Sequence, residues 1–230
     1  MYTLTDEHKI ARGARLGKIL VFGSLGFLVA GLVIALRMRG VYYLWISLGC
    51  LVIALVASTV GFAHMNRWVR EPRADQALDQ GLKGFDDHYR LYHYVLPAPH
   101  VLLSPAGLFV LTPMGQDGAI RYTEGKFRRG FSLGRIFRFL SEEGIGRPFA
   151  EGDSQVSGLR QFLLQRGMEG VDIQNLIVFY HPRAQIEATD PPRPVVVPRR
   201  LKRAIRSQPQ GRLSPSLYRQ LQELFEGGNS

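Results

Sequence analysis

The sequence predicts an α/β protein in which an N-terminal two-helix transmembrane hairpin precedes a mixed-sheet domain flanked by helices. Two observations predict this fold class. Two long runs without a charged residue follow each other closely, from Ile19 to Leu36 and from Val41 to Ala63. After them, segments rich in β-formers alternate with amphipathic segments, which is the pattern of a sheet covered by helices.

The two uncharged runs are long enough to cross a bilayer as helices. Eighteen and twenty-three helical residues rise about 27 Å and about 34 Å, and these lengths bracket a hydrocarbon core of ~30 Å. The alternatives are two buried core helices, although such adjacent runs are rare in soluble folds, or a cleaved signal peptide, for which no small-residue cleavage site follows. We expect a hairpin over residues 16–66, with spans at about 18–37 and 41–65.

The cations that flank the runs predict the orientation of the hairpin. Arg37 and Arg39 lie in the turn between the runs, whereas seven cations lie at the outer ends: Lys9, Arg12, Arg15, Lys18, Arg67, Arg70 and Arg73. The positive-inside tendency therefore places both termini, including an N-terminal segment at 1–15, and the α/β domain in the cytoplasm. The membrane is expected to be the inner (plasma) membrane.

Small residues in the two runs suggest how the spans pack. Gly26 and Ala30 form one row at four-residue spacing, and Cys50, Ala54 and Ser58 form another. We expect these rows to pack the hairpin against itself, and contact with a second copy or with another membrane protein stays open. Cys50 is the only cysteine, so an intramolecular disulfide is excluded, which fits a reducing cytoplasm.

The chain after the hairpin first predicts a helix and then three strands. Apolar residues recur at helical spacing over residues 71–85, and β-formers dominate residues 89–95. Two short β-rich runs at 100–104 and 107–112 are joined by a Pro-Ala turn and predict a β-hairpin. These elements form the first half of a domain expected over residues 67–207.

The second half of the domain predicts a further strand, an insertion and a helix. A Gly turn leads into a strand at 119–122, and residues 124–152 are rich in glycine and charge with weak periodicity, which favours a long insertion. Asp153 or Ser154 is expected to cap the next helix. The continuous apolar run at 175–180 predicts a strand that is buried on both faces.

The last third of the chain predicts one strand and two helices. A short strand is expected at 195–197 and a basic helix at 199–207. The segment 208–230 contains a C-terminal helix, because Ser214 is a suitable N-cap, Pro215 suits the first turn and apolar residues recur behind them.

The run His100-Val-Leu-Leu-Ser-Pro-Ala-Gly-Leu-Phe-Val-Leu-Thr112, with the element order around it, resembles the nuclease-related domain (NERD) family. This family has the PD-(D/E)XK nuclease-like fold. Its signature contains an acidic residue on the first strand, then Pro-x-Gly-hydrophobic-Phe-Val-hydrophobic-Glu-x-Lys, and a later helix with Gln. The matching residues here are Pro105, Gly107, Phe109 and Val110. The resemblance spans Asp75 to Ile205 and rests mostly on hydrophobic pattern.

The positions where this sequence departs from the family decide what the resemblance implies. The family's first acidic residue falls at His100, its Glu at Thr112 and its Lys at Met114. Gln155 lies where the family's Gln is expected, and Asp75 alone supplies a carboxylate, on the first helix of the domain. Metal-assisted hydrolysis of a phosphodiester needs hard oxygen ligands and a cation that stabilises the developing charge. The resemblance therefore implies a non-catalytic domain without a metal or other cofactor.

Such a domain would act as an interaction or scaffold module at the cytoplasmic membrane face, or as an accessory subunit of a membrane complex. The alternative is a membrane-tethered nucleic-acid-binding protein or nuclease with Asp75 in its site. Five neighbouring residues invite a metal interpretation, but their spacing matches no standard motif: Asp86, Asp87, His88, His93 and His100. The alternation of tyrosines in strand 89–95 would suit base stacking, and core packing explains the same pattern.

Of the net charge of +10, residues 1–65 contribute +4 and the rest of the chain +6, and two clusters of cations stand out in that second part. The first contains Lys126, Arg128, Arg129, Arg135 and Arg138. The second, on the expected basic helix, contains Arg199, Arg200, Lys202, Arg203 and Arg206. Because the domain is tied to the lipid bilayer, we expect the second cluster to meet anionic lipid headgroups, with nucleic acid as the competing partner. A solvated face without a partner is the remaining alternative.

Overall fold

The computed structural model describes residues 1–129, 144–208 and 213–227, and it confirms a mixed α/β protein with two long apolar helices near the N-terminus. The described residues divide into two compact units. The first, which we call the hairpin, comprises Glu7–Arg73. The second, which we call the domain, comprises Met1–Asp6 and the chain from Ala74 onward.

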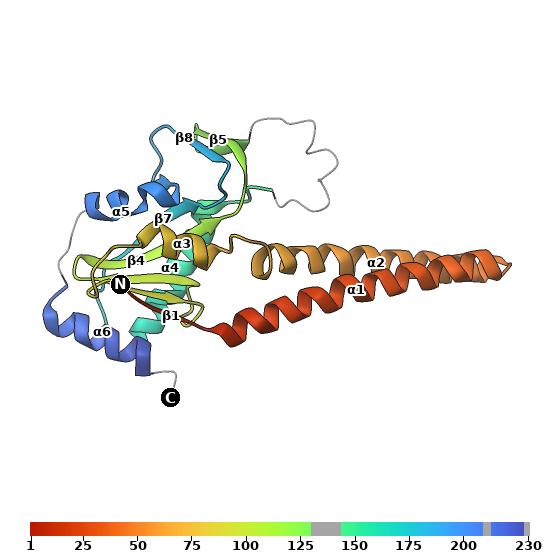
Figure 1. Ribbon diagram of the computed structural model, residues 1–230, viewed down its shortest axis with the longest axis horizontal. Coiled ribbons are helices and arrows are strands. Elements are labelled where there is room, and N and C mark those ends of the chain that lie inside the picture. The colour runs from red at the N-terminus through yellow and green to blue at the C-terminus, as the bar shows by residue number, and fades with distance from the viewer. Residues whose placement is uncertain (130–143, 209–212, 228–230) are drawn as a thin grey trace. The chain divides into compact units, whose positions relative to one another are not determined.

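The hairpin consists of α1 (Glu7–Arg37) and α2 (Val41–Trp68), which run antiparallel and side by side (Figure 1). Helices of these lengths extend about 46 Å and about 42 Å, enough for the hydrocarbon core and part of the headgroup regions. Only 11% of the most apolar window of each helix is buried within the protein, which does not fit a pair of buried core helices. Both helices could therefore span a membrane, as expected.

Small residues line the contact between α1 and α2. The buried positions are Ile10, Gly17, Ser24 and Gly31 on α1 with Ala54 and Gly61 on α2, and all but Ile10 are small. A Cβ atom at Gly61 would lie 2.8 Å from Val21 Cγ2, so the two backbones approach closely there. The Ser47 hydroxyl donates a hydrogen bond of 2.8 Å to the Gly31 carbonyl across the contact. The packing thus depends on small side chains and a polar cross-link.

The expectation that Gly26 and Ala30 pack the hairpin against itself is wrong. Both residues are exposed, and nothing lies within 4 Å of a Cβ atom built at Gly26. The row that does pack, Gly17-Ser24-Gly31, repeats every seven residues instead of every four. A seven-residue repeat keeps one stripe facing an antiparallel partner over four turns, whereas a pair four residues apart marks only one turn.

The domain is built on a six-stranded sheet with the order β1-β2-β3-β4-β7-β9. Its strands are β1 (Tyr2–Thr5), β2 (Arg90–His93), β3 (His100–Ser104), β4 (Gly107–Met114), β7 (Ile173–Phe179) and β9 (Val195–Val196). The expected meander of β2, β3 and β4 is antiparallel, and β1, β7 and β9 add in parallel. The sheet is therefore mixed, as the sequence predicts.

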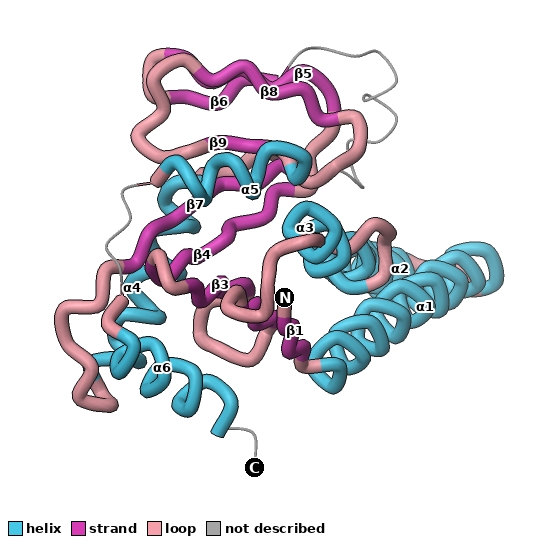
Figure 2. Tube along the Cα trace, turned by 60° about the vertical axis from the view of Figure 1, so that its left-hand side comes forward, coloured by secondary structure: helices cyan, strands magenta, loops and turns pink. Residues whose placement is uncertain are grey.

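Four helices cover the two faces of this sheet. They are α3 (Ala74–Leu82), α4 (Pro148–Leu164), α5 (Pro198–Ser207) and α6 (Pro215–Gly227). Figure 2 shows α3 and α5 on one side of the sheet and α4 and α6 on the other. We call these sides the α3 face and the α4 face.

Each face holds its own apolar core. The α3 face buries Leu78, Leu82, Leu91, Leu102, Phe109, Leu111, Leu176, Val178, Leu201 and Ile205. The α4 face buries Tyr92, Val101, Leu103, Leu108, Val110, Leu159, Leu163, Leu221 and Phe225. Residues alternate between the two cores along β2, β3 and β4, as the period of a strand requires.

A second, three-stranded sheet has the order β6-β5-β8 and consists of β5 (Gly118–Thr123), β6 (Lys126–Arg129) and β8 (Ala184–Ala188). Strands β5 and β6 form a β-hairpin whose turn is Glu124-Gly125. Both residues have a positive φ, as a two-residue turn of type I′ requires. The sequence predicts neither β6 nor β8. Residues 126–129 lie in the expected insertion, of which residues 130–143 fall outside the described part of the chain.

Two further segments differ from their sequence-based expectations. Residues 1–15 were expected as a separate segment, whereas Tyr2–Thr5 pair in parallel with β2 and α1 begins at Glu7. The fourth helix begins at Pro148, earlier than the expected cap at Asp153 or Ser154. Proline suits the first turn of a helix because it has no N–H that would need a partner there. Ser214, in contrast, caps α6 as predicted, since its hydroxyl accepts a hydrogen bond from the Leu217 N–H.

Candidate functional site

The residues at the family's acidic positions lie on opposite faces of the six-stranded sheet. His100 is two residues before Leu102, which belongs to the core of the α3 face. Thr112 is two residues after Val110, which belongs to the core of the α4 face. Because side chains alternate along a strand, His100 points to the α3 face and Thr112 to the α4 face. The structure therefore does not bring these two residues together.

Met114 and Asp75 lie on different elements, β4 and α3. Met114 is buried beyond Thr112 in a third apolar cluster with Ile177 and Phe179. Asp75 is buried in the first turn of α3 and thus belongs to the α3 face. Gln155, on α4, accepts a hydrogen bond from Thr112 on the α4 face. The sequence-predicted positions are therefore divided between the faces of the sheet.

Thr112 takes part in a polar network between α4, β4 and β7. Its hydroxyl donates to Gln155 Oε1 at 3.0 Å, and Gln155 Nε2 donates to Glu151 Oε1 at 3.2 Å. Asn175 Nδ2 donates to Thr112 Oγ1 at 2.9 Å and to the Val110 carbonyl at 3.1 Å. Thr112 and Asn175 are buried. The Thr112 hydroxyl and Asn175 Nδ2 thus have neutral hydrogen-bond partners, which position α4 on the sheet, whereas Asn175 Oδ1 is buried without one.

Close backbone packing accompanies this network. A Cβ atom at Gly152 on α4 would lie 2.8 Å from Asn175 Cγ and closer still to Asn175 Oδ1. A side chain other than hydrogen at this position would push α4 away from β7. The amide of Asn175 thus fills the space between α4 and the sheet, so no room is left there for a ligand.

The α3 face contains a second polar network, centred on two buried histidines. His93 and His100 are the cross-strand neighbours at the ends of β2 and β3, and they are 0% and 1% exposed. Their Nδ1 atoms lie 2.7 Å apart. His93 Nε2 lies 3.5 Å from Asp79 Oδ1 on α3, and the Thr3 hydroxyl of β1 donates to the same carboxylate at 3.3 Å. One network therefore joins four elements of the domain.

The distance between the two Nδ1 atoms determines how protons are arranged in the neutral pair. A hydrogen bond of this length needs one proton between the rings, so one ring donates and the other accepts. If His93 donated from Nδ1, its Nε2 would carry a lone pair instead of a proton. That lone pair would face the Asp79 carboxylate and be repelled by it. We therefore assign the Nδ1–H tautomer to His100 and the Nε2–H tautomer to His93. His93 Nε2 faces Asp79 Oδ1 at 3.5 Å without forming a hydrogen bond, so the direct hydrogen bond of this network is the one between the two rings.

The acidic residues that precede β2 have other partners. Asp87 pairs with the Met1 ammonium at 2.9 Å, and the hydrogen bond and charge of that ammonium lower the pKa of the Asp87 carboxyl. Asp86 accepts a hydrogen bond from the His88 N–H and lies 3.5 Å from its ring. In the described part of the chain, no group of three or more His, Cys, Asp or Glu side chains could hold a metal ion.

Two of the three described members of the first basic cluster, Arg128 and Arg129, lie close to carboxylates. Arg129 forms an ion pair with Asp117, which Arg183 also reaches at 3.2 Å, and Arg128 lies 4.0 Å from Glu124. Burial alone would raise the pKa of the Asp117 carboxyl, but the hydrogen bond and charge of Arg129 lower it overall, with help from His181 and Arg183. Arg135 and Arg138 lie outside the described residues.

The second basic cluster lies on α5 and divides into two groups. Leu201 and Ile205 are buried against the α3 face. Lys202 Nζ donates to the Lys83 carbonyl at 2.6 Å, and the Arg206 guanidinium lies 5.3 Å from the centre of the Phe85 ring. These two cations therefore stabilise the contact between α5 and the end of α3.

The other three cations of α5 are exposed: Arg199, Arg200 and Arg203. No hydrogen bond or ion pair joins any of their side chains to another described residue, in contrast to Lys202. Helix α5 contains no acidic residue. Of the five cations in the cluster, these three therefore form an unpaired basic surface, whereas Lys202 and Arg206 contact the domain.

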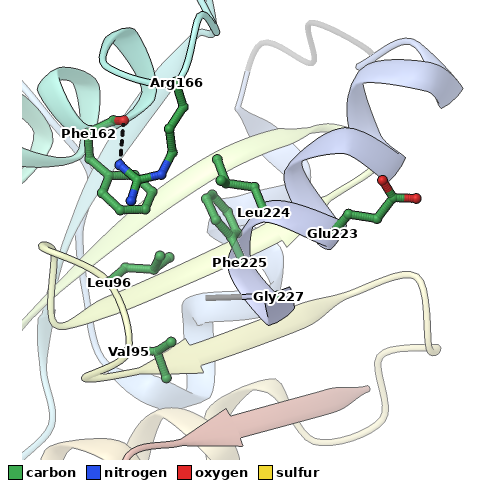
Figure 3. A pocket seen from close by; sticks show the side chains of 8 residues that line it. All are labelled: Val95, Leu96, Phe162, Arg166, Glu223, Leu224, Phe225 and Gly227. Atoms are coloured by element: carbon green, nitrogen blue, oxygen red, sulfur yellow. Dashed lines mark hydrogen bonds between the residues drawn. The ribbon is translucent and has the colours of Figure 1, made fainter. Parts of the chain in front are cut away.

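One pocket of ≈ 350 Å³ lies between α4, α6 and the loop after β2 (Figure 3). Apolar side chains such as Leu96 and Leu224 line it, together with Arg166 and Glu223. Arg166 lies over the Phe162 ring at 3.7 Å and donates to the Phe162 carbonyl, while Glu223 points away from it. In Figure 3 Arg166 is the one labelled polar side chain directed toward the pocket, and its guanidinium already contacts Phe162. The pocket therefore has few polar groups that could select a ligand.

Comparison of the chain with models of known protein families, with curated proteins and with solved structures found no significant match. The resemblance to the nuclease-related domain family therefore stays a proposal.

Proposed function

We propose that this protein is a membrane-anchored, non-catalytic nuclease-like domain that acts as an interaction or scaffold module at the cytoplasmic membrane face. The observation that carries the proposal is the separation of His100 from Thr112 on the two faces of the sheet. A hydrolytic centre needs metal ligands that converge on one point. Here the aligned residues His100 and Thr112 point to opposite faces, and each forms hydrogen bonds in a different polar network.

The way in which the chain passes from the domain to the hairpin and back supports a role at the membrane. One residue, Asp6, separates β1 from α1, and five residues, 69–73, separate α2 from α3. Both ends of the hairpin are therefore joined to the domain by short connections. A partner that is itself a membrane protein would make this chain an accessory subunit, which is one form of the proposal.

A nuclease assay tests the absence of catalysis. The full chain in detergent, with Mg²⁺ or Mn²⁺, is expected to leave DNA and RNA intact, because neutral hydrogen bonds occupy the expected site. Cleavage that disappears in Asp75→Ala and persists in Asp153→Ala, a matched change of an exposed carboxylate, would support the alternative of a membrane-tethered nuclease. Affinity capture with and without nuclease treatment separates protein partners from nucleic acid.

A labelling experiment tests the topology. In a Cys50→Ala background, a cysteine at Gly40 is expected to react with an impermeant thiol reagent from outside the cell, because seven cations flank the other end of the hairpin. A reporter fused after Ser230 is expected to be cytoplasmic. Reaction of the Gly40 cysteine only after permeabilisation would reverse the orientation.

A further inference from the structure

We propose that α5 binds the headgroups of anionic phospholipids through Arg199, Arg200 and Arg203. The inference rests on the proposed function only in placing the domain at the cytoplasmic leaflet, and it names the surface and the partner class there. Its basis is the division of the five α5 cations into two that stabilise the fold and three that do not.

The fold holds α5 rigidly while leaving these arginines free. Leu201 and Ile205 anchor the helix in the core of the α3 face, and the hydrogen bond from Lys202 to the Lys83 carbonyl ties it to the end of α3. A Cβ atom at Gly81 would lie 2.9 Å from the Pro198 carbonyl oxygen, so the start of α5 packs directly against α3. The opposite side of α5 is thus presented in one orientation, which a binding surface requires.

The position of the arginines on α5 does not benefit the helix itself. Arg199 and Arg200 lie in its first turn, where the helix dipole is positive and cations are unfavourable. No acidic side chain in that turn balances them. Three like charges within five residues also repel each other. The unfavourable charge interactions at these three arginines are offset if an anionic surface binds to the helix.

The other arginine-rich part of the described domain is different, because its cations are paired within the protein. In the sheet of β5, β6 and β8, Arg121 pairs with Glu187 at 2.7 Å, and Arg129 pairs with Asp117. Helix α5 contains no carboxylate that could do the same. Its charge is therefore available to an external anion.

The connections to the hairpin favour lipid over nucleic acid as the source of that anion. Five extended residues between α2 and α3 span at most about 18 Å, and β1 is joined to α1 through a single residue. The domain is thereby confined near a leaflet whose lipids are anionic on the cytoplasmic side, where close cations are attracted to the headgroups. Nucleic acid, in contrast, would have to reach the same surface from solution.

Energy transfer to headgroup-labelled lipid tests the proposal with the full chain in nanodiscs. The single native cysteine is removed by Cys50→Ala, and a donor dye is attached at Ser207→Cys, an exposed position at the end of α5. We expect more transfer to acceptor-labelled headgroups with phosphatidylserine than with phosphatidylcholine alone. The excess should disappear as salt rises, because the contact is electrostatic.

Three variants identify the residues responsible. The triple variant Arg199→Glu, Arg200→Glu, Arg203→Glu is expected to abolish the phosphatidylserine-dependent excess, which corresponds to a weakening on the order of 100-fold for three cations. The triple Gln variant, which keeps good helix formers, should give an intermediate loss. The control makes the same charge change at exposed cations elsewhere in the domain, Lys126→Glu, Arg160→Glu and Arg219→Glu, and should retain the excess.

Two outcomes overturn the proposal. One is equal transfer with and without phosphatidylserine, and the other is an excess that the α5 and control variants reduce alike. Binding of a DNA duplex to the same nanodiscs that is lost only in the α5 variant, with no phosphatidylserine dependence, assigns the surface to nucleic acid instead. None of these results depends on whether the domain cleaves nucleic acid, so a failure here is distinguishable from a failure of the non-catalytic proposal.

Discussion

The hairpin and the domain bury side chains by opposite rules. In the hairpin the buried residues are mostly small, such as Gly17 and Ala54, and large apolar side chains such as Phe22 are exposed. In the domain the large apolar side chains, such as Phe109, are buried, and most charged side chains are at least partly exposed. Water drives apolar groups inward, whereas lipid does not, so in a membrane only close packing and hydrogen bonds would hold the hairpin together.

The two units are therefore sensitive to different kinds of substitution. The hairpin depends on the distance between two backbones, and the domain depends on apolar cores together with two buried polar networks that position its helices and strands. Glycine is nevertheless used in both units at points of closest approach, at Gly61 in the hairpin and at Gly152 in the domain. Substitutions at such positions can therefore be compared directly between the two units.

The largest effect is expected for Gly152→Ala. The new methyl group would overlap the Asn175 amide, which is buried and hydrogen-bonded, so we expect the domain to lose about 2–3 kcal/mol of stability. Hydrogen exchange of the full chain in nanodiscs measures this loss in β4 and β7, while exchange in α1 and α2 should be unchanged. The two units would then respond separately.

Gly158→Ala is the matched control on the same helix. The nearest atom to its Cβ would be Pro97 Cβ at 3.9 Å, and alanine is the better helix former by about 1 kcal/mol. Protection in α4 is therefore expected to be unchanged or greater. Equal losses in both variants would mean that α4 is not packed on the sheet as closely as the structure indicates.

The sequence predicts most of the domain where structure depends on neighbours along the chain. β3 has its predicted bounds, and β4 runs only two residues further, because both strands are set by a β-rich pattern and a short turn. α6 begins behind its predicted cap at Ser214. β1 could not be predicted, since its four residues pair with a strand more than eighty residues away. Such a pairing leaves no local signal.

The candidate site was less predictable than the fold, because it depends on register. That His93 and His100 meet depends on the loop between them, which Tyr94 closes with a positive φ and a hydrogen bond of 2.7 Å from its N–H to the Pro99 carbonyl. A shift of one residue would point one histidine to the other face. The opposite orientations of His100 and Thr112 likewise follow from pairing, which a linear alignment with a family signature does not contain.

The next effect concerns the histidine pair. His100→Leu is expected to cost the domain about 2 kcal/mol, because the Nδ1 atom of His93 would be buried without a partner. The double variant His93→Leu, His100→Leu removes both members and should recover much of this loss. Chemical denaturation followed by near-UV circular dichroism measures the difference. Additive losses in the double variant would contradict a direct hydrogen bond between the rings.

A smaller effect is expected in the hairpin for Gly61→Ala. The new methyl group would lie 2.8 Å from Val21 Cγ2 and 3.0 Å from the Val21 backbone nitrogen, which forces α1 and α2 apart. We expect a loss of about 1–2 kcal/mol, less than in the domain because lipid accommodates separated helices better than a closed core does. Both tryptophans, Trp45 and Trp68, lie in α2, so thermal unfolding followed by tryptophan fluorescence reports on the hairpin.

Gly49→Ala is the control for this change. Nothing lies within 4 Å of a Cβ atom at Gly49, so the fluorescence transition should stay where it is in the unmodified chain. A larger loss in Gly61→Ala than in Gly152→Ala would reverse the comparison, since the hairpin would then be the more rigidly packed unit.

The smallest effect is expected for Asp117→Asn, which should make the stability of the domain, but not that of the hairpin, depend differently on pH. The side chain of Asp117 is 15% exposed and paired with Arg129, and its folded-state pKa lies below its ordinary value. A lowered pKa means that the carboxylate contributes stability above about pH 4, and that this contribution is lost as the pH falls through the folded-state value. Asp117→Asn is therefore expected to cost the domain about 1 kcal/mol at pH 7 and progressively less below pH ~4.

The matched control for this last change is Glu187→Gln. Its pair with Arg121 is about 70% exposed on both sides, and solvent-exposed pairs contribute little to stability, so we expect almost no effect at any pH. The uncharged runs of the hairpin contain no Asp, Glu, Lys or Arg, so the tryptophan transition should be insensitive to the Asp117 change. If Asp117→Asn and Glu187→Gln have the same pH profile, the pairing of Asp117 with Arg129 does not stabilise the turn before β5. The low exposure of Asp117 would then have no energetic consequence for the domain.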